Sequence, residues 1–407
     1  MLLVVAATVV FLRPPGASRA AGSGSNGRDG SHGAAPFKGK PSLRPVLSQL
    51  SFPGKLALPW PSTGESAVYI PGLGVVGTSK VQKPLPIASE TKMMTALVVL
   101  HDHPLSLGES GPEFTMTEQD HLAWIAAAEQ DNSNVMIKAG ERLSEMQLLE
   151  ALLVPSADNI ADYLARWDAG SIGGFVAKMN AEATALGLTE THYADPSGVD
   201  PHDLSTPLDQ AVLAGYAMQN PVISFIVGHV YLDLPVAGRV WNYNPALSVD
   251  GIVGVKSGFT PEAQACLVAA AWREVAGHRL LVISSTLDQP LGLAEAATVD
   301  ESLLQAVTAA LEARRLLPAG TVAATASTAW GRKTTSARTR SDLVVLGWPG
   351  LVVRPVVVET APAAGRSGWA AGSVAGLVEV SPSTTAQERV PLYLDGALGG
   401  PPANWHP

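Results

Sequence analysis

Residues 86–100, PIASETKMMTALVVL, place a serine and a lysine three positions apart at the start of an apolar run. If the run is helical, Ser89 and Lys92 lie one above the other on its first turn. The residues after Lys92 leave no polar face, so the helix is expected to be buried. A lysine at the edge of a core is costly unless it has a partner or a task.

Such a Ser-x-x-Lys pair can supply a nucleophile and its base. A serine hydroxyl becomes reactive when a neighbouring base takes its proton, and a lysine can be that base when desolvation lowers its pKa. The same pair also arises by chance roughly once in 400 residues of average composition. The pattern alone leaves a catalytic and a chance interpretation open.

The composition excludes several classes of protein. Of the 407 residues, 46% are hydrophobic, which is enough for a large core and for two domains plus a tail. No uninterrupted apolar run reaches about 18 residues, which excludes a membrane-embedded bundle. A net charge of −9 without a basic block argues against a nucleic-acid partner. The single cysteine, Cys266, permits no intrachain disulfide and is interpreted as a core residue.

The N-terminal stretch indicates export. Residues 1–13 contain an apolar run as long as a signal-peptide core and too short to span a bilayer alone, so we interpret them as a truncated signal or membrane segment. An apolar start without a targeting role is the alternative. Residues 14–49, rich in Gly, Ser and Pro, are predicted to be a flexible linker. The folded chain is expected to begin near Leu50.

From there the patterning predicts mixed α and β structure. Strands are expected at residues 66–70, 73–77, 251–260, 265–272 and 278–286, and helices at 89–100, behind Ser144, in the stretch that opens with an N-cap at Ser156, at 175–186 and at 295–317. A long irregular region precedes residue 251. The last three strands are spaced as an antiparallel meander. We therefore predict an α+β fold with helices covering one antiparallel sheet.

Residues 318–407 are predicted to form a small β-rich domain and tail. Ala, Ser and Thr dominate them, and β-like segments occur at 342–346, 351–359, 376–380 and 390–394. No reactive residues cluster in this part. Residues 50–317 are therefore expected to carry the chemistry.

Two further motifs follow the first in sequence order. SAD at residues 156–158 resembles a Ser-x-Asn motif, and KSG at residues 256–258 resembles a Lys-Thr-Gly motif. Together in this order, the three motifs mark penicillin-binding proteins and serine β-lactamases. With THYADPSG at 191–198, the chain resembles the D-alanyl-D-alanine carboxypeptidase family over roughly residues 50–317, and its actinobacterial members most of all. The resemblance implies a β-lactamase/transpeptidase-like fold, with an all-helical subdomain beside the sheet.

The resemblance also implies roles for the motif residues. Ser89 would attack the carbonyl of the penultimate D-Ala, Lys92 would accept its proton, and Ser156 would relay a proton towards the leaving amine. Lys256 and Ser257 would hold the terminal carboxylate. The residues implied in substrate binding are Lys256, Ser257, Gly258, Phe259, Thr260, Asp158 and Asn159, with the backbone N–H groups of Ser89 and Phe259 as the oxyanion hole.

One position departs from the family pattern. The expected asparagine is Asp158 here, and Asn159 follows it. An aspartate near two lysines would keep at least one of them charged, which conflicts with a lysine acting as a base. Either Asp158 turns away and Asn159 replaces it, or acylation is slow.

The resemblance implies a serine D,D-carboxypeptidase that trims peptidoglycan stem peptides outside the membrane and is acylated by β-lactam antibiotics. No cofactor, metal or nucleic acid is expected, and an N-terminal membrane tether is a further expectation. A β-lactamase or D,D-endopeptidase of the same fold is one alternative. A catalytically weak cell-wall-binding protein is another.

Overall fold

The computed structural model describes residues 42–80, 82–130, 132–328, 330, 333–360, 368–381 and 389–400. The interpretation of residues 1–13 as a signal or membrane segment, and most of the linker prediction, lie outside these ranges. No helix within them combines the length and the apolar character that crossing a membrane requires.

Five antiparallel strands form the central sheet, in the order β11-β12-β13-β3-β4. Their bounds are β3 Glu65–Ile70, β4 Gly74–Thr78, β11 Ile252–Thr260, β12 Gln264–Val275 and β13 His278–Gln289. Both Ala276 and Gly277 adopt a positive φ in the two-residue turn between β12 and β13, as tight hairpins require. The predicted meander and the predicted first hairpin are thus confirmed as one sheet.

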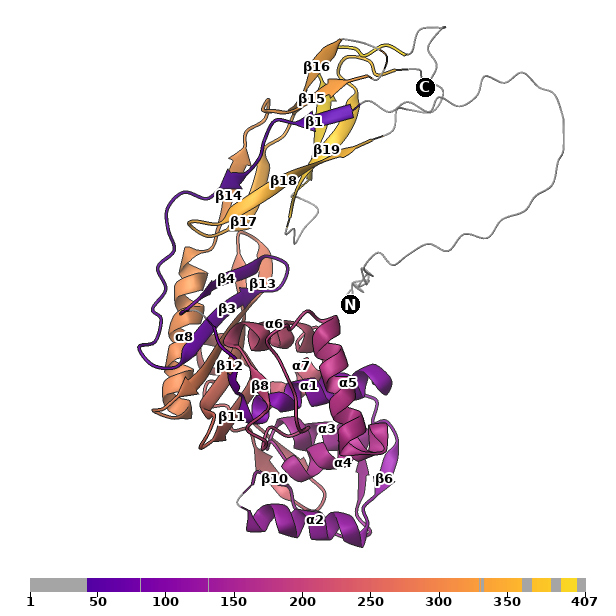
Figure 1. The fold of residues 1–407 in the computed structure, drawn as a ribbon, viewed down its shortest axis with the longest axis vertical. Coiled ribbons are helices and arrows are strands. Elements are labelled where there is room, and N and C mark those ends of the chain that lie inside the picture. The colour runs from indigo at the N-terminus through magenta and orange to yellow at the C-terminus, as the bar shows by residue number, and fades with distance from the viewer. Residues whose placement is uncertain are drawn as a thin grey trace, which may run out of the picture. The chain divides into compact units, whose positions relative to one another are not determined.

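Helices cover both faces of this sheet (Figure 1). α8 (Leu293–Ala310) packs on β12 and β13, and α6 (Pro207–Ala217) packs on β13 and β3. Residues 265–271 of β12 are all buried, and their side chains alternate between two apolar clusters, one containing α8 and the other α6. The α+β fold is confirmed.

The α6-side cluster continues into a group of helices and short strands. These are η1 Ala88–Glu90, α1 Thr91–Asp102, α2 Glu118–Glu129, α3 Glu145–Leu153, α4 Asp158–Ala169, α5 Ile172–Ala185, α7 Pro221–Val227, η2 Val249–Gly251, and the strands β5 Leu85–Pro86, β6 Glu113–Thr115, β7 Arg142–Ser144, β8 Leu204–Ser205, β9 Tyr231–Leu234 and β10 Gly238–Trp241. α1 contacts α3, α4, α5 and α6 within this group. The helix that carries the Ser-x-x-Lys motif therefore lies at its centre.

Two predictions on either side of β11 are wrong. The region before residue 251 contains α6 and α7, whose N-caps Thr206 and Asn220 each precede a proline at the first helical position. The helix expected over 295–317 ends at Ala310, because Glu312–Leu317 forms strand β14 and pairs with β17 (Leu343–Gly347). Pairing with a distant strand overrides a local helical pattern.

The remaining strands form a seven-stranded sheet in the order β1-β15-β16-β20-β19-β18-β2. Their bounds are β1 Ser42–Pro45, β2 Leu50–Ser51, β15 Val322–Ser327, β16 Thr334–Thr339, β18 Val352–Glu359, β19 Val374–Ser381 and β20 Arg389–Leu394. The β-rich character of this part is confirmed. Residues 42–45 differ from the linker prediction, because β1 pairs with β15 and buries Leu43.

Candidate active site

Ser89 lies where the turn η1 runs directly into α1. Ala88 enters the turn with a φ of 47°, and α1 follows with Met, Ala, Val and Leu on all sides. Because such a helix is stable only inside a core, the packing around α1 fixes the position of its first turn. Ser89 and Lys92 are thus held on a rigid element.

The Lys92 amine makes three hydrogen bonds inside the protein. Nζ donates to Ser89 Oγ at 2.8 Å, to Asp158 Oδ1 at 2.5 Å and to the Ser197 carbonyl at 2.6 Å. The side chain is 0% exposed. A buried lysine with every donor used has a single orientation, so its amine is fixed beside the serine hydroxyl.

Ser156 occupies the short connection between α3 and α4. The capping box between Ser144 and Gln147 starts α3, as its sequence predicts, and Ser156 adopts a φ of 65° after that helix ends. The residue is 2% exposed, and its Oγ has no hydrogen-bond partner among the described residues. Its hydroxyl is thus available to a substrate group or a water.

Asp158 and Asn159 point to different partners. Asp158 faces Lys92, as the ion pair shows, whereas the Asn159 amide accepts from Val135 N at 3.1 Å and donates to Val135 O at 2.9 Å. The hypothesis that Asn159 replaces Asp158 in the site is therefore wrong, since its side chain anchors the backbone at Val135. Burial raises the pKa of Asp158, and the attraction of Lys92 opposes this shift.

β11 passes very close to Ser89 at Gly258. A Cβ at this position would lie 2.8 Å from Ser89 N and 3.0 Å from Ile87 O. Gly198 makes a similar approach from another direction, because its Cβ would lie within 2 Å of Ala88 O. Only glycine permits this spacing, so the two positions define how the chain closes around Ser89.

Lys256 is the second buried lysine of the site. It is 2% exposed, and its Nζ donates to Ser257 O at 2.8 Å. Burial lowers the pKa of Lys256 to about 7, and the positive charge of Lys92 acts in the same direction. The charges of Asp158 and Glu90 oppose that shift. Lys256 therefore titrates near neutral pH.

The rest of β11 reaches the surface. Ser257 is buried, Phe259 is 58% exposed, and the Thr260 hydroxyl accepts from Ala263 N at 3.1 Å. The strand thus brings its motif residues to the edge of the sheet beside Ser89. An extended ligand could lie along this edge.

The loop after α5 completes the surroundings of Lys92. The Asp195 carboxylate accepts backbone N–H bonds from Ser197, Gly198 and Asp200, which fixes the Ser197 carbonyl under Lys92. Asp203 is fully buried and accepts from Ala194 N, Asp195 N and Thr91 Oγ1. Burial raises the pKa of Asp203 to about 7.

Sequence reasoning missed Asp203 and the Ser197 carbonyl. A backbone acceptor has no sequence signature, and Asp203 stands outside the family-like segment at 191–198. The signal that could have located Asp203 is Thr91 inside the first motif, a polar residue on a helix with no polar face.

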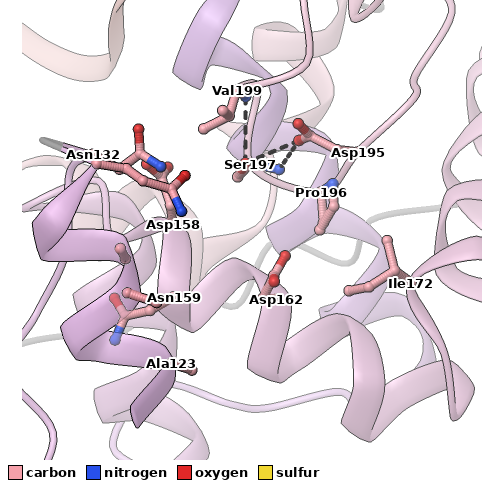
Figure 2. A pocket seen from close by; sticks show the side chains of 13 residues that line it. Ala123, Asn132, Asp158, Asn159, Asp162, Ile172, Asp195, Pro196, Ser197 and Val199 are labelled. Carbon is pink, nitrogen blue, oxygen red and sulfur yellow. Dashed lines mark hydrogen bonds between the residues drawn. The ribbon is translucent and has the colours of Figure 1, made fainter. Parts of the chain in front are cut away.

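A cavity of about 390 Å³ adjoins the Lys92–Asp158 pair (Figure 2). Figure 2 shows Asp158 and Asn159 on one side and Asp195, Pro196 and Ser197 on the other. Alanines of α2 line it as well. Because Asp158 and Ser197 both bond to Lys92 and both line the cavity, a ligand there would approach the Lys92 amine.

No group of three His, Cys, Asp or Glu side chains that could hold a metal ion occurs within the ranges that the structure describes. The arrangement instead combines a serine hydroxyl, two buried amines and a nearby free hydroxyl. Such a set can activate a nucleophile and bind an anion.

Comparison with known proteins points to one family. The family model described as D-alanyl-D-alanine carboxypeptidase, peptidase family S11, matches residues 74–290. A D-alanyl-D-alanine endopeptidase of Pseudomonas aeruginosa is 31% identical over 200 residues, which cover 45% of this chain and 58% of the relative. A D-alanyl-D-alanine carboxypeptidase of Streptomyces sp. (strain K15) is 32% identical over 202 residues, 46% of this chain and 67% of the relative.

The solved structure of penicillin binding protein 5 from Haemophilus influenzae matches with a TM-score of 0.61 and 20% identity, over 85% of this chain and all of that chain. This likeness concerns the fold. The chain spans about half to two thirds of the length of the curated relatives it matches. Because the family model covers more than half of the sequence and includes all three motifs, the chain belongs to the D-alanyl-D-alanine carboxypeptidase family, peptidase family S11.

Proposed function

We propose that the chain is a serine D,D-carboxypeptidase that removes the terminal D-Ala from peptidoglycan stem peptides through a Ser89 acyl-enzyme. The observation that carries the proposal is the 2.8 Å hydrogen bond from Lys92 Nζ to Ser89 Oγ at the end of a buried helix. Nucleophile and base are within hydrogen-bond distance, which is the geometric requirement for covalent catalysis.

In the acylation step, Lys92 acts in its uncharged form: it takes the proton of Ser89 as Ser89 Oγ attacks the carbonyl of the penultimate D-Ala, and becomes the ammonium that pairs with Asp158. The Ser89 and Phe259 N–H groups stabilise the oxyanion, each by on the order of 3 kcal/mol. The free Ser156 hydroxyl relays a proton to the leaving amine. The C–N bond breaks, D-Ala leaves, and water later hydrolyses the ester and restores Ser89.

The terminal carboxylate of the substrate binds to Lys256 and Ser257. Asp158 bonds to Lys92 and makes no direct bond to Lys256. The charge of the Lys256 amine is therefore available to an anionic ligand. Gly258 lets this part of β11 approach Ser89 closely. The carboxylate of a β-lactam would occupy the same position, which would bring the β-lactam carbonyl to Ser89 for acylation.

We also propose that the reaction takes place outside the cytoplasmic membrane, with the chain released or tethered by its N-terminal segment, because peptidoglycan lies there. Residues 50–317 would carry the reaction. The strands from residue 318 onward would have a separate role, since no reactive residues cluster in them.

The decisive experiment is labelling with a fluorescent penicillin, followed by identification of the modified residue and by assay of D-Ala release from a diacetyl tripeptide. We expect label on Ser89, none in Ser89→Ala, and at least about a thousandfold loss of D-Ala release in that variant. Label that survives Ser89→Ala contradicts the proposal. Folded wild-type protein that releases no D-Ala would favour a catalytically weak wall-binding protein.

A D,D-endopeptidase is the second candidate, because the Pseudomonas aeruginosa relative carries that name. The two activities differ in the leaving group, which is a free D-Ala in one and a cross-linked peptide in the other. Cleavage of a cross-linked muropeptide faster than the release of D-Ala would favour the endopeptidase. Rapid loss of a bound penicillin label would favour a β-lactamase instead.

A further inference from the structure

Glu90 stands between Ser89 and Lys92 in the sequence, and the mechanism above leaves it without a task. It is 0% exposed, and neither of its carboxylate oxygens has a hydrogen-bond partner among the described residues. A buried carboxylate without partners is strongly destabilising. Its presence beside the nucleophile therefore needs a reason.

The strand register places Glu90 and Lys256 in the same interface. In β11, Lys256 and Gly258 are two residues apart and point to the same face of the sheet. Gly258 contacts the backbone of η1 at Ser89, and η1 packs on both β11 and β12. The Lys256 side chain thus emerges on the face that η1 covers, where Glu90 is buried.

The site contains two buried lysines, Lys92 and Lys256, and two buried carboxylates, Asp158 and Glu90, whose charges act on Lys256. Lys92 and Asp158 form one direct pair at 2.5 Å. Lys256 makes no hydrogen bond to a carboxylate within the described residues; its printed acceptor is Ser257 O. Asp158 and Glu90 are the carboxylates whose charges act on Lys256, and Glu90 is the one of the two that makes no ion pair with Lys92, so it is the natural balancing charge.

We propose that Glu90 is a positioning residue that acts through Lys256, by supplying the buried negative charge that balances the Lys256 ammonium while this side chain holds the substrate's terminal carboxylate. The inference rests on the proposed function and deepens it, because it explains how a fully buried amine remains a cation. Glu90 itself touches neither the substrate nor the reacting atoms.

The electrostatic surroundings of the pair decide when Glu90 carries its charge. Burial raises the pKa of Glu90 well above its usual range, Asp300 of α8 adds to the shift, and Lys256 opposes it. Lys92 of α1, Asp158 of α4 and Glu90 are the charges that act on Lys256. The charge of Glu90 also acts on two titratable groups of other elements, Cys266 of β12 and Tyr193, and burial raises the pKa of both.

Burial favours the uncharged forms of both Glu90 and Lys256 while no anion is bound. When an anionic carboxylate binds to Lys256, the ammonium form becomes favoured, and its charge in turn favours the Glu90 carboxylate. Glu90 then releases one proton and Lys256 takes one up, so the pair exchanges no net proton with its surroundings.

The experiment compares Glu90→Gln with Glu90→Asp and with Glu145→Gln, which removes another buried carboxylate, on α3. The second-order rate constant for acylation is measured between about pH 6 and pH 9 with two reagents, a penicillin, which carries a carboxylate, and a neutral aryl ester, which does not. Thermal melting checks that each variant is folded.

We expect Glu90→Gln to lose about tenfold in penicillin acylation for each pH unit above the point where Lys256 loses its proton, with Glu90→Asp restoring part of the rate. Acylation by the neutral ester and the Glu145→Gln profile should match wild type. A Glu90→Gln profile identical to wild type, or an equal loss with both reagents, overturns the inference.

If Glu90→Gln does not fold, Glu90→Asp decides, because its shorter side chain moves the carboxylate relative to Lys256. A penicillin profile that begins to fall at a lower pH than in wild type, with an unchanged neutral-ester profile, supports the inference, and identical penicillin profiles of the two proteins contradict it. Penicillin acylation does not require turnover of a stem peptide. Failure of the D-Ala assay is therefore distinguishable from failure of this inference.

Discussion

The part of the chain before residue 312 and the strands after it bury different kinds of side chain. Among the described residues, every buried Asp, Glu and Lys lies in the first part: Glu65, Glu90, Lys92, Glu141, Glu145, Asp158, Asp203, Asp209, Lys256 and Asp300. In the later strands the buried polar residues are Thr328 and Thr339, and Ala, Val and Leu dominate the core. The buried charges of the proposed site, Lys92, Asp158 and Lys256, therefore belong to the first part.

Exposed ion pairs occur in both parts, whereas the buried pair Lys92–Asp158 lies in the first. In the later strands, Arg315–Asp342 and Arg338–Asp395 keep about two fifths or more of each side chain exposed. Exposed pairs of this kind contribute less than about 1 kcal/mol each. Removing one partner of a buried pair such as Lys92–Asp158 costs about 3–5 kcal/mol, because the other charge is left uncompensated. The comparison predicts that substitutions in the two parts have different consequences.

Of the substitutions that test this difference between the two parts, Gly258→Ala is expected to have the largest effect on activity. The new Cβ would lie 2.8 Å from Ser89 N, so β11 and η1 would have to separate. A misplacement of about 1 Å at a catalytic group can lower the rate about a hundredfold. We expect that loss in the rate constant for penicillin acylation, measured by stopped-flow fluorescence.

Gly173→Ala is the matched control. Gly173 lies in α5, and a Cβ there would meet nothing within 4 Å. Alanine in a helix is favoured over glycine by up to about 1 kcal/mol, so this variant should be at least as stable as wild type and equally active. A Gly258→Ala enzyme as fast as the Gly173→Ala enzyme would mean that the close approach of β11 does not matter.

A smaller effect, of opposite sign, is expected from Asp158→Asn. The ion pair with Asp158 stabilises a charged amine, and only an uncharged amine can accept the Ser89 proton. Removing the carboxylate charge should raise the acylation rate by about tenfold, equivalent to about 1.4 kcal/mol of barrier. A penicillin acylation assay near pH 7 measures the change.

Asp162→Asn serves as the control, one helical turn further along α4. Asp162 lines the same cavity and pairs with Arg166, without a bond to Lys92. Its acylation rate should stay within about twofold of wild type, since the pair is partly exposed. A loss of rate in Asp158→Asn would instead mean that the carboxylate is needed to hold Lys92 in position.

The sequence could predict what depends on short-range spacing. Three features follow from residues close together in the chain: the pair of Ser89 and Lys92, Gly258 two positions after Lys256, and the three-strand meander. The sequence could not predict which of Asp158 and Asn159 points towards Lys92. That choice depends on the two hydrogen bonds between the Asn159 amide and the Val135 backbone. The missing partner was a loop more than 20 residues away.

The other failures share this cause. The segment EARRLL at the end of the predicted 295–317 helix has a helical pattern, yet it pairs with a strand that begins at residue 343. Residues 42–45 have the composition of a linker, but they form a strand because they pair with β15, about 280 positions further along the chain. Glu90 gave no signal, since a single acid in an apolar run is ordinarily a surface residue.

The smallest effect on activity is expected from Leu392→Ala, which tests whether the core of the later strands affects the site. Leu392 is fully buried in the core of the later strands, so the cavity should lower the free energy of unfolding by about 2–5 kcal/mol. Leu304→Ala in α8 makes the same change against the central sheet, in the cluster that contains Leu267, the register partner of Ser257. Thermal melts and penicillin acylation rates of both variants are the measurements.

Both variants should melt earlier, but only Leu304→Ala should also acylate more slowly, because relaxation around its cavity can move β12 and with it β11. Leu392→Ala has no buried charge or motif residue in its cluster to disturb, so its acylation rate at 25 °C should stay within about twofold of wild type. An equal loss of rate in the two variants would mean that the later strands help to hold the site in shape. The apolar core of the later strands would then contribute to the acylation rate as much as the core that contains the buried charges.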